Sequence, residues 1–280
     1  MKRPYIGITG ITTTEQVQVI AETWNKLEFP GYDLMMGFLL SSSQTPNCVS
    51  YPPASVNPRN VDIEKLPELL GCASKSVKLK PLGNDDYAWV VRAIHYHTKN
   101  RVFFPELSWL IENYWKDGQT GFDAIQLNIA RPAPEEINKF QQKWDIDLIL
   151  QVNRSIIEHY FPDSEHEIGA RFDTSYMNCP YYLIDGSGGR GLPIDIQHSY
   201  YIKKAMMDCG FTNRFGVAGG ISAENVADII SDFPRWSIDA ESQLRNEQNK
   251  LDLEKVDQYL HNASRAITER DDSVEDEEIE

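Results

Sequence analysis

The sequence predicts an α/β fold, a single (β/α)8 TIM barrel, and three stretches in its second half carry that prediction. An apolar run at 181–184 ends in Asp185 and opens into a glycine-rich loop. A second run begins at Phe215 and ends in Gly219 and Gly220, and a third, at 236–241, ends in polar residues. Consecutive strand–loop–helix units with glycines at their strand ends are typical of a (β/α)8 barrel.

The same alternation extends along the rest of the chain, where short apolar runs precede segments with helical spacing. Strands are expected at 5–11, 33–40, 76–81, 122–128, 147–152, 181–185, 215–218 and 236–241. Helices are expected at 15–26, 61–70, 134–144, 194–208, 224–230 and 251–268, with helical pieces at 155–160 and 165–177. Because strands and helices alternate, the pattern favours one α/β domain, at residues 1–269, over two separate domains.

Residues 82–120 are expected to form a helical insertion after the third strand, with helices at 85–99 and 105–115. This segment is longer than one crossover connection needs. His95 and His97 would then lie on different faces of a helix, which argues against a metal-binding pair. We therefore expect no metal at this pair.

The composition limits the classes of partner. The chain has 280 residues, of which 41% are hydrophobic, and a formal net charge of -15. That charge argues against nucleic acid, because phosphate backbones are bound by clustered Lys and Arg. A small anion is still allowed, since a few local N–H donors suffice to bind it. Part of the charge lies in residues 270–280, which we expect to be a disordered acidic tail.

The chain is expected to be cytoplasmic and not bound to membranes. Polar residues at 12–15 interrupt the first apolar run, so no signal peptide is expected. No stretch approaches the ~18 apolar residues of a membrane helix. The scattered cysteines, without a CxxC pair, indicate reduced thiols: Cys48, Cys72, Cys179 and Cys209.

Asp185 and the glycines around it are the first candidate site. Glycine lets backbone N–H groups approach an oxyanion closely, which suits a phosphorylated ligand. A carboxylate at the C-terminal end of a barrel strand is placed for catalysis. The alternative is that Asp185 forms part of an ordinary turn.

Several stretches, in the same order along the chain, resemble phosphoribosylanthranilate isomerase, the (β/α)8 enzyme of tryptophan biosynthesis. The family's first strand, K-I-C-G-I-T, is similar to Gly7-Ile-Thr-Gly-Ile-Thr12. Its L-L-D and G-G-x-G elements are similar to Ile184-Asp185 and Gly188-Gly-Arg-Gly191, and its A-G-G-L-x-P-E-N-V to Ala218-Gly-Gly-Ile-Ser-Ala-Glu-Asn-Val226. The resemblance runs from the first strand to the last, apart from residues 82–120 and the tail.

This resemblance implies an Amadori rearrangement, an aldose–ketose isomerisation of a phosphoribosyl amine that needs no cofactor. A general acid opens the ribose ring and a general base removes the proton at C2. Asp185 takes the position of the acid, and Thr9 that of the catalytic cysteine. Arg59 takes the position that binds the anthranilate carboxylate. The residues implied for the remaining substrate contacts are Gly188, Gly189, Gly191, Gly219, Gly220 and Asp239.

Two positions depart from the family. A threonine hydroxyl is too weak an acid to serve as the base without a strong neighbouring base. Glu241 replaces a serine near the phosphate, where its charge would repel the ligand unless the side chain points away. Glu241 and Asp239 are the candidate replacement bases. Cys48, in the loop after the second strand, could supply a thiolate, but the sequence favours an ordinary loop cysteine there.

Three functions therefore remain open. The first is an isomerase acting on a small phosphorylated sugar, as a monomer or homodimer. The second is a barrel that binds phosphate or a phosphosugar without catalysis. The third is a different phosphosugar enzyme on the same scaffold.

Overall fold

A computed structural model describes residue 1 and residues 3–45, 58–83, 86–114, 121–129, 132–153, 156–157, 179–186, 192–211 and 214–277. Parallel strands close into a barrel in the order β1-β2-β5-β6-β7-β8-β9-β10, and β10 pairs with β1. The strands are β1 (Tyr5–Thr9), β2 (Asp33–Ser41), β5 (Val90–His97), β6 (Ala124–Asn128), β7 (Asp147–Asn153), β8 (Tyr181–Asp185), β9 (Arg214–Ala218) and β10 (Ser237–Ala240). The expected (β/α)8 barrel is confirmed.

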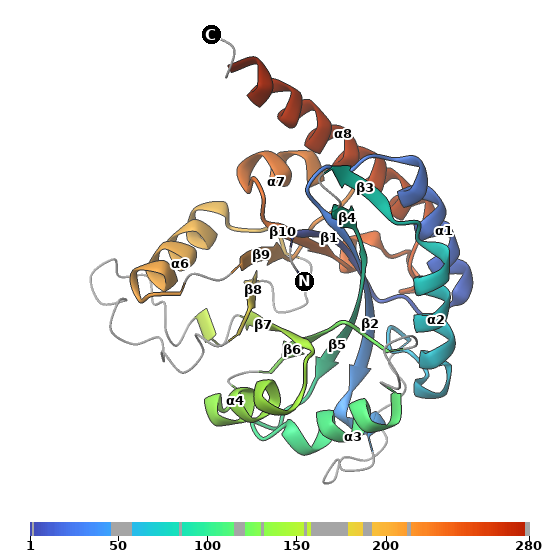
Figure 1. Ribbon diagram of the computed structural model, residues 1–280, viewed down its shortest axis with the longest axis vertical. Coiled ribbons are helices and arrows are strands. Elements are labelled where there is room, and N and C mark those ends of the chain that lie inside the picture. The colour runs from blue at the N-terminus through green and yellow to red at the C-terminus, as the bar shows by residue number, and fades with distance from the viewer. Residues whose placement is uncertain are drawn as a thin grey trace.

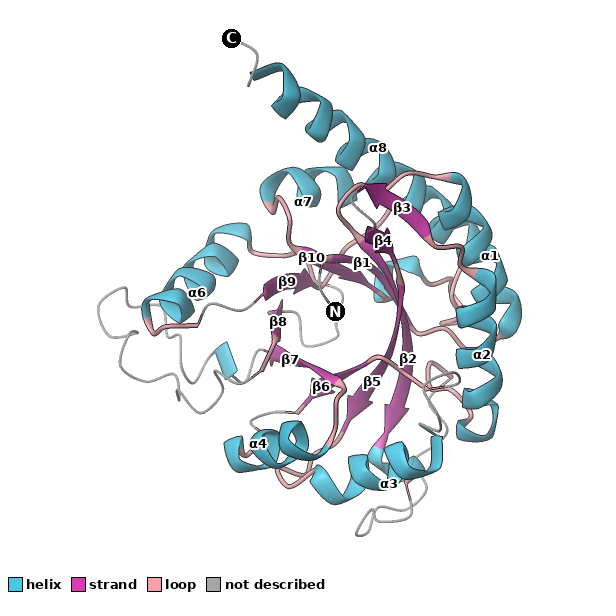
Figure 2. Ribbon diagram, in the orientation of Figure 1, coloured by secondary structure: helices cyan, strands magenta, loops and turns pink. Residues whose placement is uncertain are grey.

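Helices surround this barrel (Figures 1 and 2). They are α1 (Thr14–Lys26), α2 (Leu66–Ser76), α3 (Phe104–Tyr114), α4 (Pro134–Lys143), α6 (Ile196–Asp208), α7 (Val226–Asp232) and α8 (Leu253–Glu277), with short 3-10 turns η1 (Ser42–Gln44), η2 (Ile63–Lys65) and η5 (Ser242–Leu244). A capping box between Thr13 and Gln16 starts α1. No helix in these described segments is long and apolar enough to cross a bilayer.

The third barrel strand lies at Val90–His97, and the expectation of a helix at 85–99 was wrong. The segment expected as the third strand leads instead into β3 (Lys80–Gly83), which forms a separate antiparallel pair with β4 (Asp86–Ala88). β5 lies between β2 and β6 and is buried, so its apolar run resembles a buried helix in sequence.

The helix expected at 105–115 is confirmed as α3, but it follows β5 rather than belonging to a helical insertion. The last helix is longer than expected. α8 runs to Glu277 and includes most of the acidic segment expected to be a disordered tail, and its C-terminal end extends beyond the barrel (Figure 1). A helix anchored by packing can propagate at little cost. Of the helical pieces expected at 155–177, all but 156–157 lie outside the described residues.

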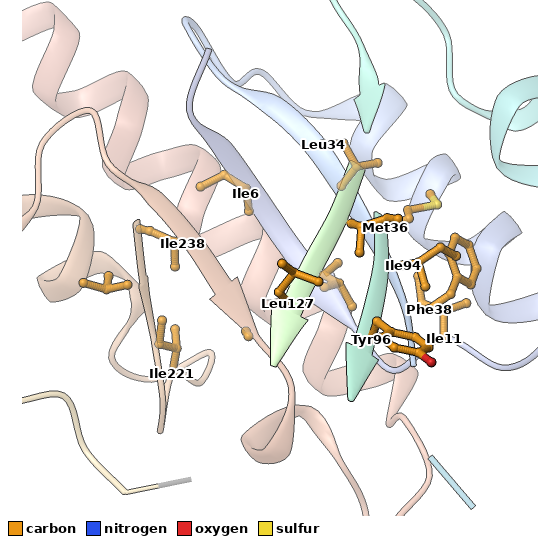
Figure 3. Close-up of a cluster of buried hydrophobic side chains, with 14 of the residues drawn as sticks. Ile6, Ile11, Leu34, Met36, Phe38, Ile94, Tyr96, Leu127, Ile221 and Ile238 are labelled. Carbon is orange, nitrogen blue, oxygen red and sulfur yellow. The ribbon is translucent and has the colours of Figure 1, made fainter. Parts of the chain in front are cut away.

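Two apolar layers hold the barrel. The larger lies between strands and helices and includes Ile6, Leu34, Met36 and Ile94 (Figure 3). The smaller layer comes from alternate strand residues and contains Tyr5, Met35, Val91, Ala93, Ala124, Ile149, Tyr181 and Leu183. Because side chains alternate along a strand, Thr9 shares its side of β1 with Tyr5 rather than with Ile6.

The contact between Arg92 and Asp123 provides a test of the corrected strand. Arg92 Nε and Nη2 donate to Asp123 Oδ2 and Oδ1, both at 2.8 Å, and the Arg92 side chain is buried. We expect Asp123→Ala to lower the free energy of unfolding by about 1–3 kcal/mol, since a buried guanidinium loses its partner. Urea denaturation measures this change.

The exposed pair between Lys204 and Asp208 on α6 is the matched control. Asp208→Ala should change the free energy of unfolding by less than about 0.5 kcal/mol. Equal effects of the two substitutions would contradict the placement of Arg92 on a buried barrel strand.

Candidate active site

A cavity of about 840 Å³ opens where the barrel strands end. Its walls come from the C-terminal ends of the barrel strands and the loops that follow. This is the end at which (β/α)8 enzymes carry their active sites. The lining residues used below are Arg59, His95, His97, Gln126, Gln151, Asp185, Gly219, Gly220, Asp239 and Glu241.

Thr9 and Asp239 form a buried hydrogen-bonded pair. The Thr9 hydroxyl donates to Asp239 Oδ1 at 2.8 Å, and the two residues are 1% and 5% exposed. They meet because β1 and β10 are adjacent, with Gly7 paired to Asp239. On the other side of β1, a Cβ on Gly37 would lie 2.2 Å from Thr9 Oγ1. Glycine at position 37 thus leaves the room that Thr9 occupies.

The pKa of the Asp239 carboxyl lies near neutral pH. Burial raises the pKa of Asp239 to about 7, and the negative charges of Glu241 and Asp185 act in the same direction. Hydrogen bonds from Thr9 and Gln126 act against the increase in pKa. A buried carboxyl with a pKa in this range is suited to proton transfer.

Asp185 is a second buried carboxyl in the same cavity. It ends β8, is 4% exposed and accepts a hydrogen bond from Gln151 Nε2 at its Oδ2, at 2.6 Å. The structure thus brings together the expected Asp185, Asp239 and Thr9. Gln151 comes from β7 and had no signal in the sequence beyond its place in an apolar strand.

His95 and His97 also belong to the site, contrary to the expectation from a helix. They lie two apart on β5, and therefore on the same side of the strand, and both line the cavity. Gln126 Nε2 lies 3.3 Å from His95 Nδ1. An amide nitrogen only donates, so Nδ1 accepts and the proton of the neutral ring is assigned to Nε2.

Burial lowers the pKa of His95, while the charges of Glu241 and Asp185 oppose that decrease. His95 is therefore neutral at physiological pH. In the described part of the chain, no group of three or more His, Cys, Asp or Glu side chains is arranged to hold a metal ion.

Glu241 is held by two arginines at the rim of the cavity. Arg59 Nη1 and Arg245 Nη2 donate to the same oxygen, Glu241 Oε1, at 3.3 and 3.1 Å. Arg59 Nε also donates to Asn249 Oδ1 at 2.9 Å. Gly10, with φ +95°, makes room for Arg245, because a Cβ there would lie 1.8 Å from Arg245 Nη2. The charge of Glu241 is thus offset by Arg59, which the sequence singled out, and by Arg245, which it did not.

Gly219 and Gly220 follow β9 and line the cavity with positive φ values of 108° and 60°. A Cβ on Gly220 would lie 2.6 Å from the Leu192 carbonyl oxygen, so the two loops approach closely there. Of the other expected residues, Gly188, Gly189, Gly191 and Cys48 lie outside the described residues.

The pKa of Asp239 makes stability depend on pH. An unfolded Asp has a pKa of about 3.9, so between about pH 4 and 7 the folded state holds a proton that the unfolded state has lost. Stability from this group therefore decreases as the pH rises. We expect the free energy of unfolding of Asp239→Asn, relative to that of the unmodified protein, to increase by up to about 4 kcal/mol between pH 4 and pH 8.

Urea denaturation at each pH measures this difference, and Asp208→Asn, an exposed position on α6, is the control. A difference between Asp239→Asn and the unmodified protein that stays constant with pH would show that Asp239 has an ordinary pKa.

Comparisons with known proteins identify the fold. Neither the protein-family models nor the curated proteins match this chain. Among solved structures, N-(5'-phosphoribosyl)anthranilate isomerase from Pyrococcus furiosus is 17% identical, with a TM-score of 0.59 over 94% of this chain and 99% of that chain. The Thermotoga maritima enzyme is 18% identical, with a TM-score of 0.57 over 94% and 99%.

A third structure, of phosphoribosyl anthranilate isomerase with reduced 1-(o-carboxyphenylamino)-1-deoxyribulose 5-phosphate, is 17% identical. Its TM-score is 0.56 over 94% of this chain and 99% of that chain. At these identities the comparisons establish a shared (β/α)8 barrel along nearly the whole chain.

Proposed function

We propose that this protein catalyses the Amadori-type isomerisation of a phosphoribosyl amine in tryptophan biosynthesis, as phosphoribosylanthranilate isomerase does. The observation that carries the proposal is the pair of buried carboxyls, Asp185 and Asp239, which line one cavity from β8 and β10. The similarity of the barrel to isomerases of this type over nearly the full chain supports it.

The reaction needs one group that donates a proton and one that accepts a proton. Asp185, in its protonated form, is the acid that protonates the ring oxygen as the C1–O bond opens to an imine. Asp239 is the base that takes the proton from C2 and leaves an enolamine, which tautomerises to the ketose. With a pKa of about 7, Asp239 is partly ionised at neutral pH and is a stronger base than an ordinary carboxylate.

Thr9 is a positioning residue in this scheme. Its hydroxyl donates to Asp239, so it orients the carboxylate and favours its ionised form. The base thus moves from β1, where the family has cysteine, to the neighbouring strand β10. This assignment removes the difficulty that a threonine hydroxyl is a poor base.

The charged ends of the substrate go to the rim of the cavity. Backbone N–H groups near Gly219 and Gly220, with those of the expected loop glycines, bind the phosphate. Arg59 binds the carboxylate of the aromatic ring. The protein works in the cytoplasm and needs no cofactor, as expected of this reaction, and is a monomer or homodimer.

Glu241 supports a second candidate, a barrel that binds a phosphosugar without isomerising it. Its carboxylate pairs with Arg59, and Glu241 replaces a serine that the family has near the phosphate. A ligand carboxylate would share Arg59 with Glu241, which weakens binding of a doubly anionic substrate.

Isomerase assays on the purified protein separate these functions. We expect turnover of phosphoribosylanthranilate, and a decrease in kcat/KM of about 100- to 10,000-fold in both Asp185→Asn and Asp239→Asn. Asp208→Asn, outside the cavity, should retain full activity. Growth of a tryptophan auxotroph that lacks the isomerase provides the same comparison in cells.

Lack of turnover by the unmodified protein would exclude the isomerase and leave the binding barrel or a different phosphosugar enzyme. Phosphosugar titration then tests binding. Retained activity in Asp239→Asn alone would move the base to another group.

The pH dependence of kcat/KM tests the role of Thr9. With Asp239 as base and Asp185 as acid, the profile should be bell-shaped, and one of its two apparent pKa values should lie near 7. Thr9→Val removes a hydrogen bond that favours the carboxylate, so this apparent pKa should move upward, and Thr9→Ser should restore it. An unchanged profile in Thr9→Val would show that Thr9 has no influence on the base.

A further inference from the structure

Two glutamines in the wall of the cavity have buried amide oxygens without a partner. Gln126 on β6 and Gln151 on β7 are 1% and 3% exposed, and both line the cavity. Neither Gln126 Oε1 nor Gln151 Oε1 has a hydrogen-bond partner among the described residues. Gln126 pairs with Ile149, two residues before Gln151, so the two side chains share one side of the sheet.

The contacts of the two amide nitrogens explain why the amide oxygens have no hydrogen-bond partner. Gln151 Nε2 donates to Asp185 Oδ2 at 2.6 Å. Gln126 Nε2 contacts His95 Nδ1 at 3.3 Å, and Gln126 also hydrogen-bonds Asp239. An ionised carboxylate only accepts, so each amide turns its nitrogen toward its carboxyl when that carboxyl is ionised. Rotating either amide in that state would bring two acceptors together.

Unpartnered buried acceptors are rare in folded proteins, and each one destabilises the fold. Several other buried polar atoms in the described part of the chain also lack a partner, but Gln126 and Gln151 are the two of these residues that line the cavity. Both atoms are acceptors, and each belongs to a glutamine that holds one of the two candidate catalytic carboxyls. Their location in the site points to a ligand that supplies the missing donors.

We propose that Gln126 and Gln151 form a hydroxyl-reading subsite for a polyhydroxy ligand. Amide oxygens accept hydrogen bonds from hydroxyl groups and would repel a phosphate or carboxylate. The cavity is thereby divided into a wall on β6 and β7 that binds sugar hydroxyls and a rim at Gly219 and Gly220 that binds the anion. The proposal deepens the proposed function, since it names the part of the substrate read at this wall.

Deoxy sugars test the subsite, because they remove one donor and leave the rest of the ligand in place. We expect the protein to bind ribose 5-phosphate at least about tenfold more tightly than 2-deoxyribose 5-phosphate or its 3-deoxy isomer, as measured by isothermal titration calorimetry. Free ribose and 2-deoxyribose, compared by saturation-transfer NMR, give the same contrast without phosphate.

In Gln151→Met and in Gln126→Met the preference for the hydroxylated sugar should decrease to within about twofold, because the acceptor is gone. Gln18→Met, at an exposed position on α1, is the matched control and should keep the full preference. The comparison of ligands on the unmodified protein stands even where a substitution prevents folding.

The outcomes separate the two proposals. Equal binding of ribose 5-phosphate and both deoxy sugars would overturn the subsite and leave the proposed function intact. A preference for free ribose without binding of any phosphosugar would support the subsite and overturn the proposed function. No preference and no binding in either series would overturn both.

Discussion

The hydrogen bond between Thr9 and Asp239 is the interaction on which the rest of the site depends, because it lies where the barrel closes. β1 and β10 come from distant parts of the chain and pair only when the last strand meets the first. This closure removes Asp239 from water, so its pKa rises to about 7. A carboxyl that exchanges its proton near neutral pH therefore results from tertiary structure rather than from a local motif.

Side chains on the neighbouring strands β6 and β7 stabilise the two buried carboxyls. Gln126 and Gln151 turn their amide nitrogens toward Asp239 and Asp185, and each hydrogen bond compensates part of the cost of removing a carboxyl from water. At the rim, Arg245 and Arg59 offset Glu241 in the same way. The net charge of -15 thus says little about the cavity, where individual acids have their own donors.

Much of the barrel was predictable because most strands are short apolar runs that end in polar or glycine residues. β5 was the exception. Its sequence, Val90-Val-Arg-Ala-Ile-His-Tyr-His97, is buried against two neighbouring strands, and buried strands lose the alternation that distinguishes them from helices. The same error kept His95 and His97 out of the predicted site. Residues two apart lie on different faces of a helix but on the same face of a strand.

The sequence by itself determined the fold class and the position of Asp185, Gly219 and Gly220 at strand ends, because strand ends are local features of composition. Only the tertiary structure decided which of these residues meet, that Thr9 donates to Asp239, and that Glu241 is held by Arg59 and Arg245. Burial and the distances between strands control pKa values and hydrogen bonds, and both arise from packing between residues that are far apart along the chain.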